Sequence, residues 1–319
     1  MPNRNRLTLL IAFAVVYTIW GSTYLAIRFA IETIPPFLMA GVRFFIAGLV
    51  MYGIALVQGA PRSGFREWKT ALIMGSCLLV AGNGGVTIAE KYVSSGIASV
   101  MVATVPIYIA LLGWAVGLVP RPRPIVWLGL AGGFVGVAIL IGPALSFTNG
   151  PGAHPEIGML ILLVSSFVWS AGSLYARTAK NAASPFLATA QQMLCGGAIL
   201  TIIGLAVGEF PHVKFHEMSA RSLGAFAYLI FVGAIVGYTA YTWLLRNCEP
   251  AKVATHAYVN PIVAVLLGAA FAGETLSGRA ILAATLIVGS VALVITIEQS
   301  QTRMTPPLES GVSLEDPAS

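Results

Sequence analysis

Two stretches of the chain, PFLMAGVRFF at residues 36–45 and PFLATAQQML at residues 185–194, begin with the same triplet, and each opens a long apolar run. The offset of 149 residues that aligns them also places Trp169 on Trp20. An offset of 155 residues aligns a later pair of runs through proline, isoleucine and glycine. Matches in register at four separate runs indicate an internal duplication with a short loop insertion.

The composition predicts that most of the surface faces lipid. Of 319 residues, 57% are hydrophobic and 9% are charged, whereas soluble domains carry about 25% charged residues. The net charge of +6 would suggest anionic partners in a soluble protein. Here the basic residues lie in short links between apolar runs, so we expect them to set membrane topology, and no nucleic-acid partner is expected.

Ten apolar runs are long enough for transmembrane helices, since a bilayer core needs about 20 residues. Short alternating segments typical of a membrane β-barrel are absent from the sequence. The first run is too long for a signal peptide and lacks a small-residue cleavage site, so it is taken as a retained span. The predicted spans are 7–27, 37–57, 69–89, 94–118, 124–141, 157–176, 185–207, 222–245, 252–272 and 278–297.

The basic residues predict the orientation. With the amino terminus inside, twelve of the 18 Lys and Arg residues fall in cytoplasmic segments, five fall outside, and Arg43 lies within a span. Cytoplasmic links carry the excess of positive charge in membrane proteins. This bias predicts that both termini are cytoplasmic and that the number of spans is even.

The fold class predicted is an all-α membrane protein of ten transmembrane helices, built as two inverted five-helix repeats. The first repeat covers 1–150, the second covers 151–298, and the polar tail 299–319 is predicted to be disordered and cytoplasmic. Because five is odd, the second repeat must enter the membrane from the opposite side. Inverted repeats are the architecture of many secondary transporters, which is an inference from architecture alone.

Several segments resemble one known family. IWGSTYLAIR (19–28), PPFLMAGVRF (35–44), GNGGVTIAEKYVSSGIASVMVATVP (82–106), AYVNPIVAVLLG (257–268) and GETLS (273–277) are similar to the EamA-type branch of the drug/metabolite transporter superfamily, above all to its YedA-like permeases. The resemblance covers nearly the whole chain. It implies a ten-helix bacterial inner-membrane carrier, and characterised relatives export amino acids and related metabolites or move other small solutes.

Polar and aromatic side chains within the spans are the candidates for a solute cavity, because polar groups in a bilayer are costly. Each also has a structural interpretation, as an interfacial anchor, a packing residue or an interhelical hydrogen-bond partner. The predicted cavity residues are Trp20, Thr23, Tyr24, Arg43, Asn83, Thr87, Trp169, Gln191, Gln192, Tyr238, Tyr241, His256 and Asn260.

Arg43 is the clearest of these candidates. Its planar guanidinium suits a solute carboxylate or phosphate, although a structural contact to backbone carbonyls is the alternative. Its repeat partner is Gln192, beside Gln191, which fits either a site near the symmetry axis or interhelical hydrogen bonds. Asn83, Thr87 and Glu90, at i, i+4 and i+7, predict one polar face of the third span, which suits either a cavity wall or helix packing.

Prolines and a histidine suggest moving parts. Pro106 and Pro261 occupy equivalent positions and predict kinked helices that rock during transport, although prolines are common in membrane helices. His256 is a candidate proton carrier, because histidine is the residue type that titrates near neutral pH. The alternative is a hydrogen-bonded packing residue. No acidic residue lies in the middle of a span; Glu90 and Glu274 lie near span ends. The small multidrug relatives carry an essential glutamate in their first helix, and this chain does not.

The expected function is a secondary carrier that exports a small polar metabolite, an amino acid or a derivative, by alternating access. A multidrug exporter and an importer of sugars or nucleosides are the alternatives. A membrane enzyme is the remote one, since His212 and His216 have metal-compatible spacing in an otherwise ordinary polar loop. No GxxxxGK[ST] loop is present, and we expect neither cofactors nor catalytic or metal-binding residues.

The expected partners are the small-molecule solute and the lipid bilayer. Glycines at 129, 132, 133 and 136 favour close helix contact, either within the monomer or in a homodimer. The three cysteines show neither disulfide nor metal-site spacing.

Overall fold

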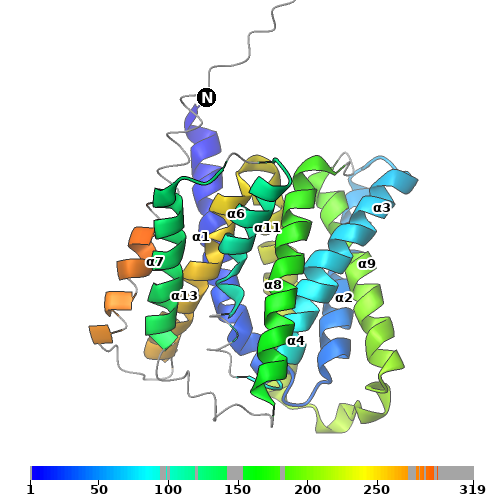
Figure 1. The fold of residues 1–319 in the computed structure, drawn as a ribbon. Coiled ribbons are helices and arrows are strands. Elements are labelled where there is room, and N and C mark those ends of the chain that lie inside the picture. The colour runs from blue at the N-terminus through cyan, green and yellow to red at the C-terminus, as the bar shows by residue number, and fades with distance from the viewer. Residues whose placement is uncertain are drawn as a thin grey trace, which may run out of the picture.

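The structure is a computed structural model in which the described residues form helices joined by turns and short links, with no strand among those residues. Figure 1 shows the helices running roughly side by side, with the links at two opposite ends and the amino terminus at the top. The residues that the structure describes are 2–93, 98, 101–118, 121–141, 154–179, 184–271, 278–279, 281–283, 285–290 and 293.

The helices follow the predicted spans closely in most of the chain. They are α1 (Pro2–Ala30), α2 (Pro36–Val57), α3 (Phe65–Met74), η1 (Gly75–Gly84), α4 (Gly85–Ala89), α6 (Val105–Ala115), α7 (Pro124–Ile141), α8 (Pro155–Thr178), α9 (Pro185–Ala206), η3 (Phe210–His212), η4 (Phe215–Glu217), α10 (Ala220–Tyr228), η5 (Leu229–Tyr238), α11 (Thr239–Asn247), α12 (Pro250–Ala254) and α13 (His256–Phe271).

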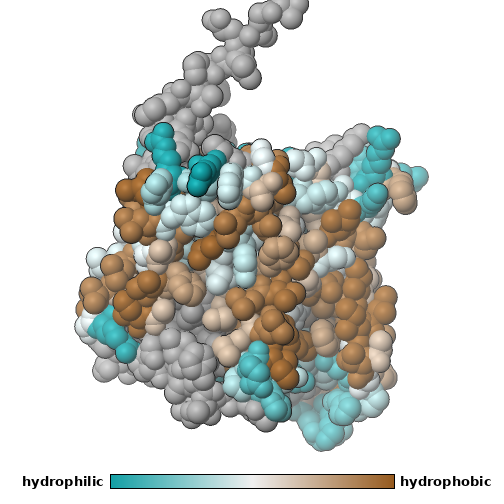
Figure 2. Space-filling model, in the orientation of Figure 1, coloured by the Kyte–Doolittle hydropathy of each residue, from teal (hydrophilic) through white to brown (hydrophobic). Residues whose placement is uncertain are grey.

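A lipid-facing belt surrounds these helices. Figure 2 shows hydrophobic side chains across the middle of the molecule and most hydrophilic ones at its two ends. Large apolar side chains such as Leu128, Leu160 and Ile202 are about two-thirds exposed, which water would penalise and lipid does not. Among the described residues, six helical stretches have the length and apolar character to cross a membrane: 6–30, 36–57, 65–89, 155–178, 185–206 and 220–247.

The predicted fourth and ninth spans are not continuous helices, and this corrects the sequence-based boundaries. The ninth is divided at Thr255 into α12 and α13, and α6 begins only at Val105. At each boundary a threonine hydroxyl, of Thr104 or Thr255, donates to the carbonyl three residues earlier, at 2.6 Å. Such local bonds compete with regular helix.

The prolines themselves are not where the chain breaks. Pro106 lies in the first turn of α6, where a missing N–H costs nothing, and Pro261 lies inside α13. Among the described residues the helices are interrupted at the threonines that precede the two prolines, and the kinks expected at Pro106 and Pro261 stay a prediction. The span count of ten, the tail 299–319 and parts of the last spans lie outside what the described residues test.

α2 and α9 have the same length and the same ends. Both begin with proline at the first helical position, which is favoured because that N–H has no partner in a helix. Both are followed by a glycine in the left-handed region, Gly59 with φ +77° and Gly208 with φ +78°. The amides of Ala60 and Glu209 then bond back to Ala55 and Gly204, each at 2.9 Å. The helices are related by the offset of 149 residues.

Two π-helical segments also lie at nearly equivalent positions, η1 in the third predicted span and η5 in the eighth. A π-helix is wider than an α-helix and shifts the faces that its residues occupy, and such segments are frequent at functional sites. Both segments contribute side chains to the central cavity described below.

The backbones of α2 and α9 approach closely at glycines. A Cβ atom on Gly197 would lie 2.5 Å from the amide nitrogen of Phe45 and 2.9 Å from the carbonyl oxygen of Gly41. A Cβ atom on Gly48 would lie 2.8 Å from the amide nitrogen of Leu194. These contacts leave no room for any side chain, because backbone atoms cannot move aside cheaply.

Glycines of α7 pack within the chain in the same way. Added Cβ atoms on Gly132, Gly133 and Gly136 would meet Ser290, Tyr258 and Ile287, respectively, at 2.7–2.8 Å. These three glycines therefore pack against other helices of the same chain. The homodimer remains a prediction.

The glycine contact predicts opposite effects of one substitution at two helix positions. Gly197→Ala should destabilise the protein by about 1–3 kcal/mol, because the new methyl group overlaps the backbone of α2. Gly53→Ala, on α2 with nothing within 4 Å of the added atom, should be neutral or stabilising, because alanine favours helix over glycine by about 1 kcal/mol. Thermal unfolding midpoints in one detergent compare them. Equal midpoints for the two variants would contradict the packing described here.

Candidate functional site

A cavity lies between the two halves of the chain, bounded by α1, α2, the η1–α4 segment, α8, η5 and α13. Its volume of about 80 Å³ holds a few water molecules, whereas ligand pockets commonly measure about 300 Å³ or more. A metabolite therefore requires the walls to move apart. Nine of the thirteen predicted cavity residues line it: Trp20, Thr23, Tyr24, Arg43, Asn83, Trp169, Tyr238, His256 and Asn260.

Trp20 and its repeat counterpart Trp169 contact each other in the wall of this cavity. Their ring centroids are 5.5 Å apart in an edge-to-face arrangement. Tyr241 lies 4.7 Å from Trp20 and 5.3 Å from Trp169, and the His256 ring lies 5.0 Å from Trp20. Aromatic pairs at such distances stabilise each other through their quadrupoles, so the four rings form one packed aromatic cluster.

Hydrogen bonds hold this aromatic cluster in place. The indole N–H of Trp169 donates to the hydroxyl of Tyr241 at 2.8 Å, and Ser173 bonds to the same hydroxyl at 2.7 Å. His256 Nδ1 lies 2.8 Å from the carbonyl oxygen of Val253. Tyr241 does not line the cavity itself, so its contribution is to position the two tryptophans.

Arg43 is the charged group in the described cavity wall. Its side chain is buried, with 2% exposure. One guanidinium nitrogen, Nη2, donates to Oδ1 of Asn83, and the Phe44 ring centroid is 4.5 Å from the guanidinium carbon. The Nε atom is buried without a hydrogen-bond partner. A buried guanidinium with an unused donor beside a cavity has the chemistry to bind an anion.

An unused acceptor lies on another wall of the same cavity. The side chain of Asn260 bonds to the hydroxyl of Tyr24, but its Oδ1 is buried and has no partner. A buried carbonyl oxygen without a donor is costly. The cavity therefore combines an unsatisfied donor on α2 with an unsatisfied acceptor on α13.

The sequence places Glu90 near the end of a span, but it does not predict that the side chain is buried. It follows α4, is 7% exposed, and neither carboxyl oxygen has a hydrogen-bond partner. Arg28 and Arg43 lie within electrostatic range of it. The signal that pointed to it was its spacing of seven residues from Asn83, but no pattern indicated that two arginines from other helices converge there.

Three of the predicted cavity residues other than Tyr241 do not line it. Thr87 is buried and donates to the carbonyl oxygen of Asn83 at 2.9 Å. Gln192 accepts from the Tyr238 hydroxyl at 3.0 Å and contacts the sulfur of Met74. Gln191 is buried with both side-chain polar atoms unpartnered. Gln192 therefore makes hydrogen bonds between helices, which is the structural interpretation offered for it from the sequence.

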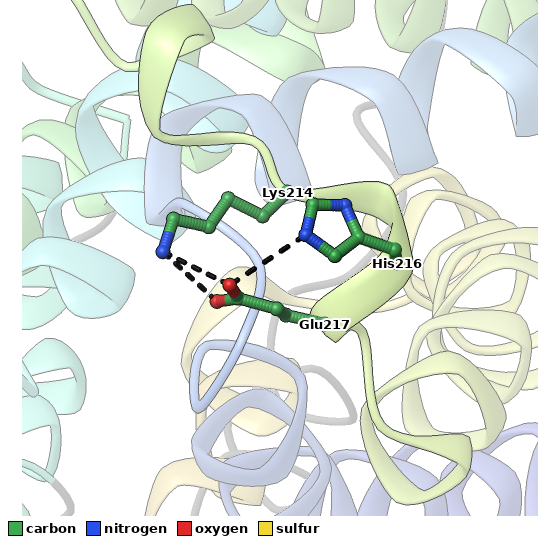
Figure 3. A network of polar contacts seen from close by, with 3 residues as sticks. All are labelled: Lys214, His216 and Glu217. Atoms are coloured by element: carbon green, nitrogen blue, oxygen red, sulfur yellow. Dashed lines mark hydrogen bonds and ion pairs between the residues drawn. The ribbon is translucent and has the colours of Figure 1, made fainter.

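The loop that contains His212 and His216 forms ordinary surface contacts. Figure 3 shows Lys214 and His216 both directed at the carboxylate of Glu217, with Lys214 Nζ at 3.0 Å and His216 Nε2 at 3.6 Å. His212 Nδ1 lies 3.0 Å from the carbonyl oxygen of Gly208 instead. Within the described residues, no group of three His, Cys, Asp or Glu side chains has metal-site geometry.

The sequence profile of the EamA-like transporter family matches the chain twice, at residues 7–142 and 156–296. The chain belongs to the EamA-like transporter family.

Relatives of this EamA-like chain carry transporter names. It is 38% identical over 296 residues to the uncharacterized inner membrane transporter YedA of Escherichia coli K12, covering 92% of each chain. It is 27% identical to the uncharacterized transporter YvbV of Bacillus subtilis, covering 93% of this chain and 94% of that one. A solved crystal structure with 18% identity superposes with a TM-score of 0.72 over 92% of this chain and 98% of the other, which shows a shared fold.

These matches make the chain a multi-pass inner-membrane transporter of the EamA-like family.

The positioning role of Tyr241 in this EamA-like chain predicts a stability loss. Tyr241→Phe keeps the ring but leaves the Trp169 indole N–H and Ser173 without their shared partner, so it should cost about 1 kcal/mol. Tyr52→Phe is the matched control, because Tyr52 packs on Trp68 and its hydroxyl makes no hydrogen bond in the described residues. Thermal unfolding in detergent measures both. If Tyr241→Phe unfolds at the wild-type temperature, the hydroxyl does not hold the tryptophans.

Proposed function

We propose that this chain is a secondary transporter that exports an amino acid or a small amino-acid derivative by alternating access between two inverted repeats. The proposal rests on one observation above others. The central cavity has an arginine with an unused donor on one wall and an asparagine with an unused acceptor on another.

These two groups fit a zwitterion. The carboxylate of an amino acid would take the free donor capacity of Arg43, since arginine binds carboxylates with a planar fork. The ammonium group would take Oδ1 of Asn260. Trp20 and Tyr238 line the same cavity and offer aromatic surface to the solute side chain.

A cationic drug fits the described walls less well. Among the described lining residues, Arg43 carries a permanent positive charge and no side chain is a carboxylate. Like charge in a low-dielectric site repels a cation strongly. The multidrug alternative therefore has less support than a solute that carries a carboxylate.

The repeat arrangement supports alternating access. The family profile matches two consecutive segments. α2 and α9 share their length, a proline at the first position and a glycine after the helix end, and Trp20 contacts its counterpart Trp169. An inverted pair of five-helix units has two near-equivalent arrangements, one open to each side.

A closure toward the amino-terminal face supports the same mechanism. On the amino-terminal side of the aromatic cluster, the hydroxyls of Tyr17 on α1 and Thr255 at the α12–α13 junction are bonded at 2.6 Å. Breaking this bond and separating α1 from α13 would open the cavity to that face. The small cavity volume fits a state in which the walls are closed around the site.

Transport in liposomes tests the substrate class. Purified protein should exchange a labelled amino acid across the membrane in counterflow, and Arg43→Gln should reduce transport at low substrate concentration at least about tenfold, because a charge-assisted bond is worth about 1.5–3 kcal/mol. Arg66→Gln, at an exposed site in α3, is the matched control. A Michaelis analysis should place most of the loss in KM, provided that both variants show wild-type unfolding midpoints.

Two results would refute the substrate assignment. Transport of none of a broad panel of amino acids and derivatives would remove it. Unchanged transport by a stably folded Arg43→Gln protein would remove Arg43 from the site.

Topology reporters test the inversion. With an odd number of spans in the first repeat, a fusion after His154 should report the periplasm, while fusions at Ser63 and at the amino terminus should report the cytoplasm. Fluorescent-protein and alkaline-phosphatase fusions at the same positions give opposite readouts. A cytoplasmic signal at His154 would rule out a five-helix first repeat.

A further inference from the structure

A second concavity, of about 620 Å³, opens at the face of the molecule that carries the amino terminus. It is formed by the first turns of α1, the end of α8 and the junction of α11 with α12. Tyr17 belongs to its wall, so the Tyr17–Thr255 bond lies between this concavity and the central cavity. It is separate from the proposed transport site, and the inference below does not depend on the proposed function.

Positive charge gathers around this concavity. Arg6, Arg177, Arg246 and Lys252 line it, together with the single carboxylate of Glu249. Arg177 uses both terminal nitrogens on Glu249, at 2.9 and 3.3 Å. Three cations thus remain around the same hollow without a carboxylate partner among the described residues.

Arg246 is the most informative of these three. Its Nη2 atom is buried and has no hydrogen-bond partner. A desolvated guanidinium nitrogen is costly unless a ligand or counter-ion bonds to it. The positive-inside rule accounts for basic residues at a membrane face, but it does not account for a residue in the wall of a hollow whose guanidinium has a buried nitrogen without a partner.

The remaining wall is apolar and continues onto the lipid-facing surface. Leu9, Leu10 and Phe13 of α1 line the concavity, and Leu10 is 61% exposed. Leu7 and Ile11, beside it on α1, are 59% and 55% exposed. One ligand that touched both parts would need an anionic head and a hydrocarbon tail.

We infer that this concavity binds the phosphate group of an anionic phospholipid, with an acyl chain lying along the exposed leucines of α1. Basic pockets between transmembrane helices at a membrane face are recognition sites for anionic lipid headgroups. Arg246 and Lys252 bind the phosphate, and Arg6 extends the positive field toward the headgroup. The exposed apolar wall favours a lipid over a soluble phosphate.

The described residues at the opposite end of the molecule have a different charge pattern. The concavity there, of about 760 Å³, has Lys91 and Lys214 among its lining residues, but also Glu32, Glu209 and Glu217. Glu209 accepts from the amides of Phe37 and Leu38 at the start of α2, at 3.2 and 2.8 Å. An anion is therefore expected at the amino-terminal face alone.

Lipid-dependent stability tests the inference. The full-length protein, delipidated in a nonionic detergent, is melted with added phosphatidylglycerol, phosphatidylethanolamine or inorganic phosphate. Phosphatidylglycerol should raise the unfolding midpoint, and the other two should not. The double variant Arg246→Gln/Lys252→Gln should bind phosphatidylglycerol about tenfold to thirtyfold more weakly, from the typical contribution of two basic residues near an anionic lipid.

The matched control removes the same charge elsewhere on the same face. Arg62, in the link between α2 and α3, and Arg66, in the first turn of α3, are exposed and do not line the concavity. Arg62→Gln/Arg66→Gln should keep the wild-type response to phosphatidylglycerol. Native mass spectrometry of the wild type in an equal mixture of the two lipids adds a readout that needs no variant, and it should show one retained phosphatidylglycerol.

Each contrary outcome overturns the inference. An equal shift with phosphatidylethanolamine would mean general solvation by lipid, and an equal shift with inorganic phosphate would mean a soluble-anion site. An equal loss in the control variant would mean non-specific surface charge. If the double variant does not fold, the lipid preference of the wild type decides, and no preference for phosphatidylglycerol refutes the site.

Discussion

The close contact between the backbones of α2 and α9 is the interaction on which the described structure depends. In lipid, apolar burial between helices provides little driving force, so association relies on close van der Waals packing at small residues. Gly41, Gly48 and Gly197 allow this approach. The contact joins one helix from each repeat, and it fixes the face of α2 on which Arg43 lies. A wider separation here would change the distance between Arg43 and the residues of η5 on the other side of the cavity.

A buried arginine is tolerated only where its surroundings compensate for the loss of hydration. Asn83 accepts one of its bonds, the Phe44 ring offers a cation–π contact, and Glu90 lies within electrostatic range. These partners leave the guanidinium partly unsatisfied, which would be wasteful in a residue with a purely structural role. Partial satisfaction is what a binding group for a transient anion requires, because a fully bonded arginine would have to break its own contacts before it could bind a solute.

Much of this arrangement could be predicted from the sequence, since hydropathy and turn residues locate helices well when the solvent is lipid. The ends of α2 and α9 were set by proline and by glycine, and the cavity residues Trp20, Arg43 and Asn83 followed from the cost of polar groups in a bilayer. The interruptions at Thr104 and Thr255 were missed, because a threonine hydroxyl bonds to the helix backbone or away from it depending on its surroundings. Thr87 was misplaced for a related reason: spacing on an ideal α-helix was assumed across a segment whose first part is π-helical. The burial of Glu90 depends on three helices at once, and no local pattern contains that information.

Residues at equivalent positions of the two repeats make different contacts. Trp20 and Trp169 occupy equivalent positions and touch, yet the Trp169 indole bonds to Tyr241, while Trp20 packs its ring against His256. Arg43 faces the cavity, whereas its counterpart Gln192 bonds to Tyr238 between helices. A duplicated frame with identical contents would recognise a solute equally on both sides of its axis. In the proposed carrier, the two halves differ at these positions, so the frame keeps two near-equivalent arrangements while the recognition groups stay on one side. In that mechanism, symmetry in the helices serves the motion, and asymmetry in the side chains serves the choice of solute.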